Sequence, residues 1–238
     1  MLADEYEKKF RSKKHRRFLS RLLIPIALLL AACLGIPKIL QKLGFTDTRK
    51  VASLEHGWNL ILVNGDFRVP DDLPLDLVEI RGGEQVDERI LPDLNRMFEA
   101  MRAEGLDPIV ASGYRTAAVQ QSFMEEKTES LIAEGYSEEE AEEEAKNWVA
   151  RVGSSEHQTG LAIDINDASG VVGGDWPIYN WLAVHARDYG FIYRYREEKK
   201  ERTGFSCEPW HYRYVGPEAA KEIEERGLCL EEYLDELG

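Results

Sequence analysis

Apolar residues recur with helical spacing in several parts of the chain, and this spacing predicts the helices. From Val86 to Met101 they return every three or four residues, as on the buried face of an amphipathic helix. A similar pattern runs over residues 178–189. A third helix is predicted to start near Thr116, and a fourth after Ser137, where Glu140 completes a capping box.

Four shorter segments have the composition or the alternation of β-strands. They cover residues 58–63, 108–112, 161–165 and 210–215, and the first of them ends at the turn signal Asn64-Gly65-Asp66. Because strands and helices are mixed without a regular strand–helix–strand rhythm, the sequence predicts an α+β fold. We expect a small, largely antiparallel sheet with flanking helices.

The longest apolar run predicts a membrane segment near the amino terminus. Leu22 to Leu40 contains 19 residues, of which only Lys38 is charged. A helix of this length just spans the hydrocarbon core of a bilayer. Residues 1–21 carry eight Lys and Arg against three acidic residues, so the positive-inside rule places them in the cytoplasm and the rest of the chain outside.

On this basis the chain divides into a basic cytoplasmic tip (residues 1–21), a transmembrane anchor (22–40), a polar tether (41–56) and an extracytoplasmic domain (57–238). A lipoprotein is the open alternative, since Leu30-Ala31-Ala32-Cys33 resembles a cleavage box with Cys33 as the lipidated residue. The apolar run continues past Cys33, which favours an uncleaved anchor. Both interpretations place the domain on the outer side of a membrane.

The net charge of −14 is unevenly distributed and argues against nucleic-acid binding. Residues 43–238 alone carry −21, and a nucleic-acid-binding protein needs a basic face to displace counterions. The acidic surface is more typical of solubility. An outside location would permit a disulfide between Cys207 and Cys229, but the sequence leaves two free thiols equally open.

Two of the five histidines lie in segments that are dense with polar and turn residues. His157 precedes Gly160 and then Asp164, whose neighbours in the predicted strand are apolar. A lone carboxylate among buried aliphatic side chains is costly, and a metal ion would satisfy it. Together with His211 these residues offer two imidazoles and a carboxylate, the ligand set of a catalytic zinc site with an open fourth position. Glu208 is left free to act as a base.

Three motifs occur in a fixed order along the domain. They are Ser112-Gly113-Tyr114-Arg115-Thr116, Ser155-x-His157-x-x-Gly160-x-Ala162-x-Asp164 and Glu208-x-Trp210-His211. Together they resemble the zinc D-alanyl-D-alanine carboxypeptidases of the VanY type, and the resemblance covers roughly residues 58–216. It implies the small α+β fold that these peptidases share with hedgehog domains.

The resemblance also implies a role for each matching residue. His157, Asp164 and His211 match the ligands of one zinc ion per chain, and Glu208 matches the general base. The matching substrate-binding positions are Arg115, Gln120, Ser155, Tyr195 and Trp210. The implied partner is the peptide stem of bacterial peptidoglycan, from which the C-terminal D-alanine is removed.

Two alternatives to this function remain open at the level of the sequence. The same fold could serve an L,D-carboxypeptidase or an endopeptidase that cuts within the stem, although Arg115 and Ser155 favour removal of a terminal residue. It could also serve a non-catalytic, hedgehog-like binding module. The presence of Glu208 argues against that module, because binding alone does not need a base.

Overall fold

The computed structural model describes residues 47–168 and 177–238. Residues 49–238 form one compact unit. The expected basic tip and membrane anchor, residues 1–40, lie outside the described residues. Within the described ranges, no helix has both the length and the apolar composition that a bilayer crossing requires.

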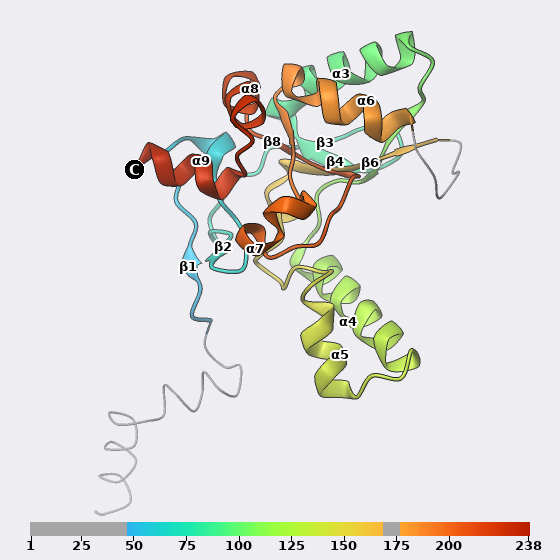
Figure 1. The fold of residues 1–238 in the computed structure, drawn as a ribbon, viewed down its shortest axis with the longest axis vertical. Helices are drawn as coiled ribbons and strands as arrows, with labels where there is room; N and C mark the ends of the chain where they lie inside the picture. Colours follow the sequence, from blue (N-terminus) through green and yellow to red (C-terminus); the bar gives the residue numbers. More distant parts are fainter. Residues whose placement is uncertain (1–46, 169–176) are drawn as a thin grey trace, which may run out of the picture. The chain divides into compact units, whose positions relative to one another are not determined.

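Short strands and medium-length helices alternate irregularly along the compact unit, as expected for an α+β fold (Figure 1). The strands are β1 (Lys50–Val51), β2 (Phe67–Arg68), β3 (Leu77–Glu79), β4 (Gln85–Asp87), β5 (Pro108–Ser112), β6 (Ala162–Asp167), β7 (Phe191–Tyr193) and β8 (His211–Tyr214). The α-helices are α3 (Leu91–Ala103), α4 (Ala117–Ala133), α5 (Glu138–Ala145), α6 (Pro177–His185), α7 (Lys200–Thr203), α8 (Pro217–Arg226) and α9 (Leu230–Leu237). Short 3-10 turns include η1 (Trp58–Leu60), η3 (Glu156–Thr159) and η4 (Ala186–Tyr189).

The main sheet has four antiparallel strands in the order β5-β6-β8-β7, which confirms the expected antiparallel arrangement. Asp164 on β6 lies opposite His211 on β8, so the pleat directs both side chains to the same face. A register shift between Val110 and Ser112 at the end of β5 leaves Ser112 beside Asp164. One face of the sheet therefore gathers the polar side chains.

The opposite face of the sheet is apolar and forms the main core. Ile163 and Ile165 of β6 pack there against Met97 and Met101 of α3, and all four are fully buried. Figure 1 shows α3 and α6 on the same side of the sheet, while the α4–α5 hairpin extends away from it. A second, smaller cluster joins Ile192 of β7 to α8 and α9.

Most of the predicted elements are confirmed, but one predicted strand and one predicted helix start were wrong. The segment 58–63 is not a strand; it begins as the 3-10 turn η1 after Gly57, whose φ of 105° favours glycine. Val86 belongs to β4, so the predicted helix starts only at Leu91, where Pro92 in its first turn suits a helix start. The apolar residue Val86 of β4 happens to continue the helical spacing of the apolar residues of α3, so the sequence pattern placed the helix start too early.

The amino-terminal end of the compact unit starts within the segment that we had assigned to the tether. Lys50 and Val51 pair in parallel with β2, and Ala52 is buried in the core. Cys207 and Cys229 are free thiols, Cys207 exposed and Cys229 buried.

Candidate metal centre and substrate pocket

Three side chains from separate elements converge at one point on the polar face of the sheet. Asp164 and His211 come from the paired strands β6 and β8, and His157 comes from the turn η3. Gly160 ends that turn with φ 71° and packs against the backbone of Asp87, where a β-carbon would come within 3.0 Å of the amide nitrogen. This close approach allows the chain to pass directly from His157 into β6.

The two imidazoles meet at a single carboxylate oxygen. Oδ1 of Asp164 lies 3.3 Å from Nε2 of His157 and 3.0 Å from Nδ1 of His211. One ligand atom from each of the three residues lies within 4.8 Å of the others. Two nitrogens and one oxygen at this spacing are a donor set suited to zinc.

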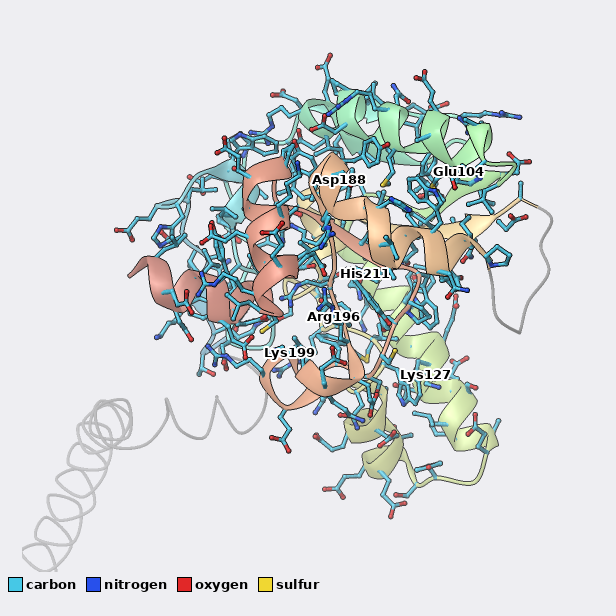
Figure 2. All side chains as sticks on the ribbon, turned by 45° about the horizontal axis from the view of Figure 1, so that its top comes forward. Glu104, Lys127, Asp188, Arg196, Lys199 and His211 are labelled. Carbon is cyan, nitrogen blue, oxygen red and sulfur yellow. The ribbon has the colours of Figure 1, made fainter. Side chains whose placement is uncertain are left out.

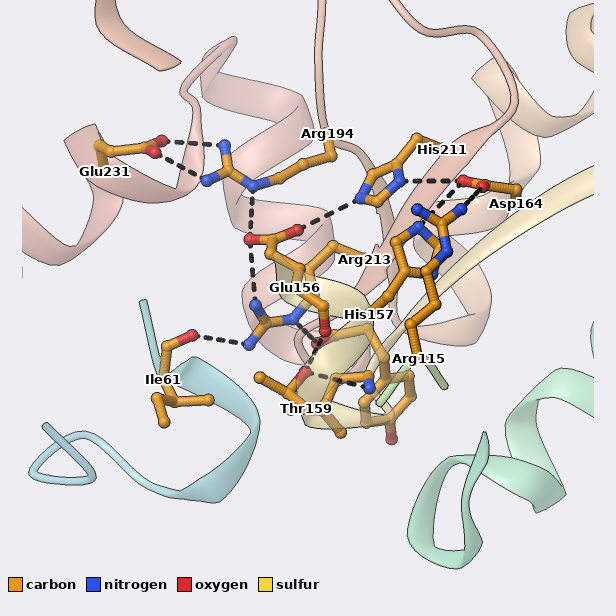
Figure 3. Close-up of polar contacts among 12 residues, drawn as sticks. Ile61, Arg115, Glu156, His157, Thr159, Asp164, Arg194, His211, Arg213 and Glu231 are labelled. Atoms are coloured by element: carbon orange, nitrogen blue, oxygen red, sulfur yellow. Dashed lines mark hydrogen bonds and ion pairs between the residues drawn. The ribbon is translucent and has the colours of Figure 1, made fainter. Parts of the chain in front are cut away.

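The second nitrogen of each imidazole is held by an outer partner. Nδ1 of His157 lies 2.8 Å from the carbonyl oxygen of Gly113, and Nε2 of His211 lies 3.4 Å from Oε2 of Glu156 (Figure 3). Partners of this kind fix the orientation of metal-binding histidines. They leave Nε2 of His157 and Nδ1 of His211 directed at Asp164.

The carboxylates of Asp164 and Glu156 favour a positive charge at the centre, carried by a protonated His211 or by a metal ion in place of that proton. Burial lowers the pKa of His157, which keeps that imidazole neutral, as a metal ligand must be. Burial also opposes a charge on His211, but hydrogen bonds to Asp164 and Glu156 raise its pKa to about 9. Burial would raise the pKa of Asp164, yet the two histidines outweigh it and hold that pKa well below its ordinary value.

Glu208 faces the centre from a tight turn. The amide of His211 donates to the carbonyl oxygen of Glu208 at 3.0 Å, with Pro209 at the second position of the turn, as its fixed φ favours. Burial and the nearby carboxylates raise the pKa of Glu208 to about 7, against the lowering effect of His211 and Arg115. A carboxyl with this pKa can accept and release a proton near neutrality.

All nine residues to which the sequence assigned a site role line one pocket around this centre. They are Arg115, Gln120, Ser155, His157, Asp164, Tyr195, Glu208, Trp210 and His211. The ring of Tyr195 stacks on His211 with 4.8 Å between centroids, and Trp210 is 37% exposed at the rim.

Arg115 is held beside the centre by two hydrogen bonds, and one of its guanidinium nitrogens remains available to donate to a ligand. Its Nη2 lies 2.7 Å from Oδ2 of Asp164, its Nε donates to Oγ of Ser112 at 2.8 Å, and its guanidinium lies over the ring of Phe123. Its Nη1 has no hydrogen-bond partner among the described residues. An anionic group that enters the pocket can bind there.

Gln120 presents an acceptor that has no partner within the described part of the chain. Its Nε2 donates to the carbonyl oxygen of Ala150 at 2.7 Å, which directs Oε1 away from that contact. Oε1 makes no hydrogen bond to the protein, and because the residue is only 1% exposed, bulk water does not supply one either. A buried acceptor of this kind is costly unless a ligand donates to it. Gln120 and the nearby Ser155 are therefore suited to a polar ligand.

Two groups of residues at the site were not predicted from the sequence. Phe123 and Trp148 line the pocket on the side of the α4–α5 hairpin, where Lys127, labelled in Figure 2, lies 4.9 Å from the Trp148 ring centroid. The other group consists of Arg194, Arg213 and Glu231 behind Glu156. The sequence offered one signal for the second group: Arg213 lies within the buried strand β8, and Glu231 lies among the apolar residues of α9.

Comparisons with known proteins agree with this geometry. The family model for VanY, D-alanyl-D-alanine carboxypeptidase, matches residues 83–217. A D-alanyl-D-alanine carboxypeptidase of Enterococcus faecalis is 50% identical over 188 residues, which are 79% of this chain and 70% of that protein.

Two solved structures match the compact unit with similar quality. A mutant of the vancomycin resistance D,D-pentapeptidase VanY in complex with Zn(II) is 50% identical, with a TM-score of 0.71 over 74% of this chain and 99% of that one. VanYB in complex with D-alanine-D-alanine is 50% identical, with a TM-score of 0.72 over 75% of this chain and 98% of that one.

Proposed function

Since this chain belongs to the VanY family of D-alanyl-D-alanine carboxypeptidases, we propose that it removes the C-terminal D-alanine from peptidoglycan stem peptides with one bound zinc ion. The observation that carries the proposal is that Glu208 and Arg115 flank the same three-ligand centre in one pocket. The first supplies a base, and the second supplies a positive charge for the terminal carboxylate.

His157, Asp164 and His211 would hold the zinc ion. Their donor set fits this metal, and each histidine has its other nitrogen engaged by an outer partner. When bound, zinc polarises a carbonyl group and lowers the pKa of a water molecule toward neutrality.

Glu208 accepts the proton of the attacking water and delivers it to the leaving amine. The two transfers need a group that is basic in one step and acidic in the next, and a pKa of about 7 suits both. Glu156 is a poor base in comparison, although it lies close by. Burial would raise its pKa, but the charges of Arg194 and Arg213 hold that pKa well below its ordinary value.

Arg115, Ser155 and Gln120 bind the leaving residue. The free Nη1 of Arg115 bonds to its carboxylate, with the Ser155 hydroxyl as a second donor, and the unpartnered Oε1 of Gln120 accepts from a substrate donor. Tyr195 and Trp210 form the walls around it. This arrangement favours the last bond of the stem, because only the terminal residue has a free α-carboxylate.

The products formed from defined stems test this function. We expect the zinc-loaded chain to shorten a pentapeptide stem that ends in D-Ala-D-Ala by one alanine, as measured by mass spectrometry. Removal of the last residue from a tetrapeptide stem instead would identify an L,D-carboxypeptidase. Cleavage inside the stem would identify an endopeptidase, and no cleavage with intact zinc binding would identify a binding module.

We also propose that residues 22–40 anchor the protein in the bacterial cell membrane, with residues 1–21 inside and the enzyme outside. The apolar run and the excess of Lys and Arg before it support this topology. Protease added to cells stripped of their wall should degrade the enzymatic domain. Protection of the domain would contradict the topology, and an intact amino terminus would reject lipidation at Cys33.

A further inference from the structure

A balanced group of four buried charges lies on the far side of His211 from Asp164 (Figure 3). Glu156, Arg194 and Arg213 have fully buried side chains, and that of Glu231 is 3% exposed. Two negative and two positive charges in the interior are costly to desolvate, even when they are paired. In other proteins, apolar side chains often replace such buried ion pairs without loss of stability, so the contacts of this network point to a role at the centre beside it.

The network forms a continuous series of contacts from helix α9 to His211. Both carboxylate oxygens of Glu231 accept from Arg194, at 2.7 Å from Nη2 and 2.9 Å from Nη1. Nε of Arg194 donates to Oε1 of Glu156 at 2.8 Å. The remaining oxygen of Glu156 is the one that lies 3.4 Å from Nε2 of His211.

Further contacts restrict the same groups. Arg213 donates to Oε1 of Glu156 at 3.1 Å while its Nη2 bonds to the carbonyl oxygen of Ile61, so Glu156 is held from two sides. The Arg194 guanidinium also lies 4.9 Å from the ring centroid of Tyr195, and that ring stacks on His211. Arg194 therefore reaches His211 both through a carboxylate and through an aromatic ring.

We propose that Glu231 and Arg194 are positioning residues for His211, so that helix α9 sets how tightly the centre holds its metal. They act through Glu156, which accepts a hydrogen bond from Nε2 of His211. This contact orients the imidazole ring of His211 and leaves its Nδ1 for the metal. The proposal rests on the proposed function in taking His211 as a zinc ligand. It assigns a role at the centre to a helix that contributes no residue to the pocket.

The zinc affinity of the full chain tests the proposal without any measurement of hydrolysis. Glu231→Gln keeps the shape of the side chain but removes the charge that fixes Arg194. Loss of a direct outer partner of a metal ligand typically costs about 10- to 100-fold in metal affinity, and Glu231 acts on that partner, Glu156, through Arg194, so we take the low end of this range. We expect the zinc dissociation constant, measured by competition with a chromophoric chelator, to rise about 10-fold, and the visible spectrum of the cobalt(II)-substituted protein to change.

Glu236→Gln is the matched control, because it makes the same change in the same helix at an exposed ion pair with Arg226. It should leave the zinc affinity and the cobalt spectrum as in the unmodified chain. Glu231→Asp keeps the charge but withdraws the carboxylate, and it replaces Glu231→Gln if that variant does not fold. Unmodified affinity and spectrum in a folded Glu231 variant would overturn the proposal. Absence of zinc binding by the unmodified chain would instead overturn the proposed function.

Discussion

At the scale of single residues, Glu208 separates metal binding from chemistry. It lines the pocket but is not among the three ligands, so Glu208→Gln should keep zinc. Without a base, kcat should fall at least about 10²-fold, the low end for general-base catalysis. Turnover and zinc content measured on the same sample check both statements. Near-normal turnover in this variant would mean that another group takes the proton.

Arg115 should make the enzyme select substrates with a free terminal carboxylate. Charge-assisted hydrogen bonds contribute about 1.5–3 kcal/mol each, so amidation of the pentapeptide should lower kcat/KM about 10- to 10²-fold or more. Arg115→Ala also removes a partner of Asp164, so its overall loss mixes two effects. The informative quantity is the ratio of kcat/KM for the free-acid peptide to kcat/KM for the amidated peptide, which should approach one in the variant. An unmodified chain that cleaves both peptides equally would contradict the carboxypeptidase assignment.

At the scale of elements, the local patterns were sufficient to predict the strands and helices that carry the site. Alternation identified β6 with Asp164 among aliphatic residues, a capping box identified the start of α5, and the helix start predicted near Thr116 is confirmed by α4, whose N-cap is Thr116. The segment 58–63 was misassigned because an apolar run does not distinguish a strand from other buried backbone. The strands β3, β4 and β7 are too short for alternation to be recognised.

The junction of β4 with the end of β5 should be sensitive to a single methyl group. A β-carbon on Gly113 would lie 2.2 Å from the backbone oxygen of Gln85, and the carbonyl of Gly113 is the outer partner of His157. Gly113→Ala should therefore separate the strands, at a cost of about 1–3 kcal/mol in stability. It should also weaken zinc binding about 10-fold or more by displacing His157.

Gly65→Ala is the matched control for that substitution, because a β-carbon at Gly65 has no atom within 4 Å. Thermal unfolding and zinc competition on the two variants check the prediction. Equal behaviour of Gly113→Ala and Gly65→Ala would show that β4 does not position the centre.

At the scale of the whole molecule, the sequence could predict the residues that converge in the candidate centre but not the network behind them. His157, Asp164, Glu208 and His211 lie in short motifs whose chemistry is readable from residue type and spacing. Arg194 and Glu231 lie in no motif, and they are 37 residues apart in the chain. Their pairing depends on how α9 packs against β7 and α8, which no local pattern specifies. The same limit applies to Phe123 and Trp148, which the α4–α5 hairpin brings to the pocket.

The buried network should also make the stability of the molecule depend on acid pH. Burial would raise the pKa of Glu231, but the charge of Arg194 outweighs it and lowers that pKa below its ordinary value of 4.5. A group with a depressed folded-state pKa contributes stability that is present above its unfolded pKa and is lost as the pH falls through the folded one. Glu231→Gln should therefore be less stable than the unmodified chain at pH 7, by about 3–5 kcal/mol, since Arg194 loses a buried partner.

This difference should shrink as the pH falls below 4.5, because the unfolded chain then takes up a proton at Glu231 before the folded chain does, and it should be lost once the folded carboxylate is protonated as well. Urea unfolding of both proteins between neutral and acid pH, with a chelator present so that metal release does not contribute, measures it. Glu236→Gln, which changes an exposed pair, should follow the unmodified chain throughout. A difference that stays constant across this range would show that Glu231 stabilises the fold by packing, because only an ionic contribution is lost on protonation.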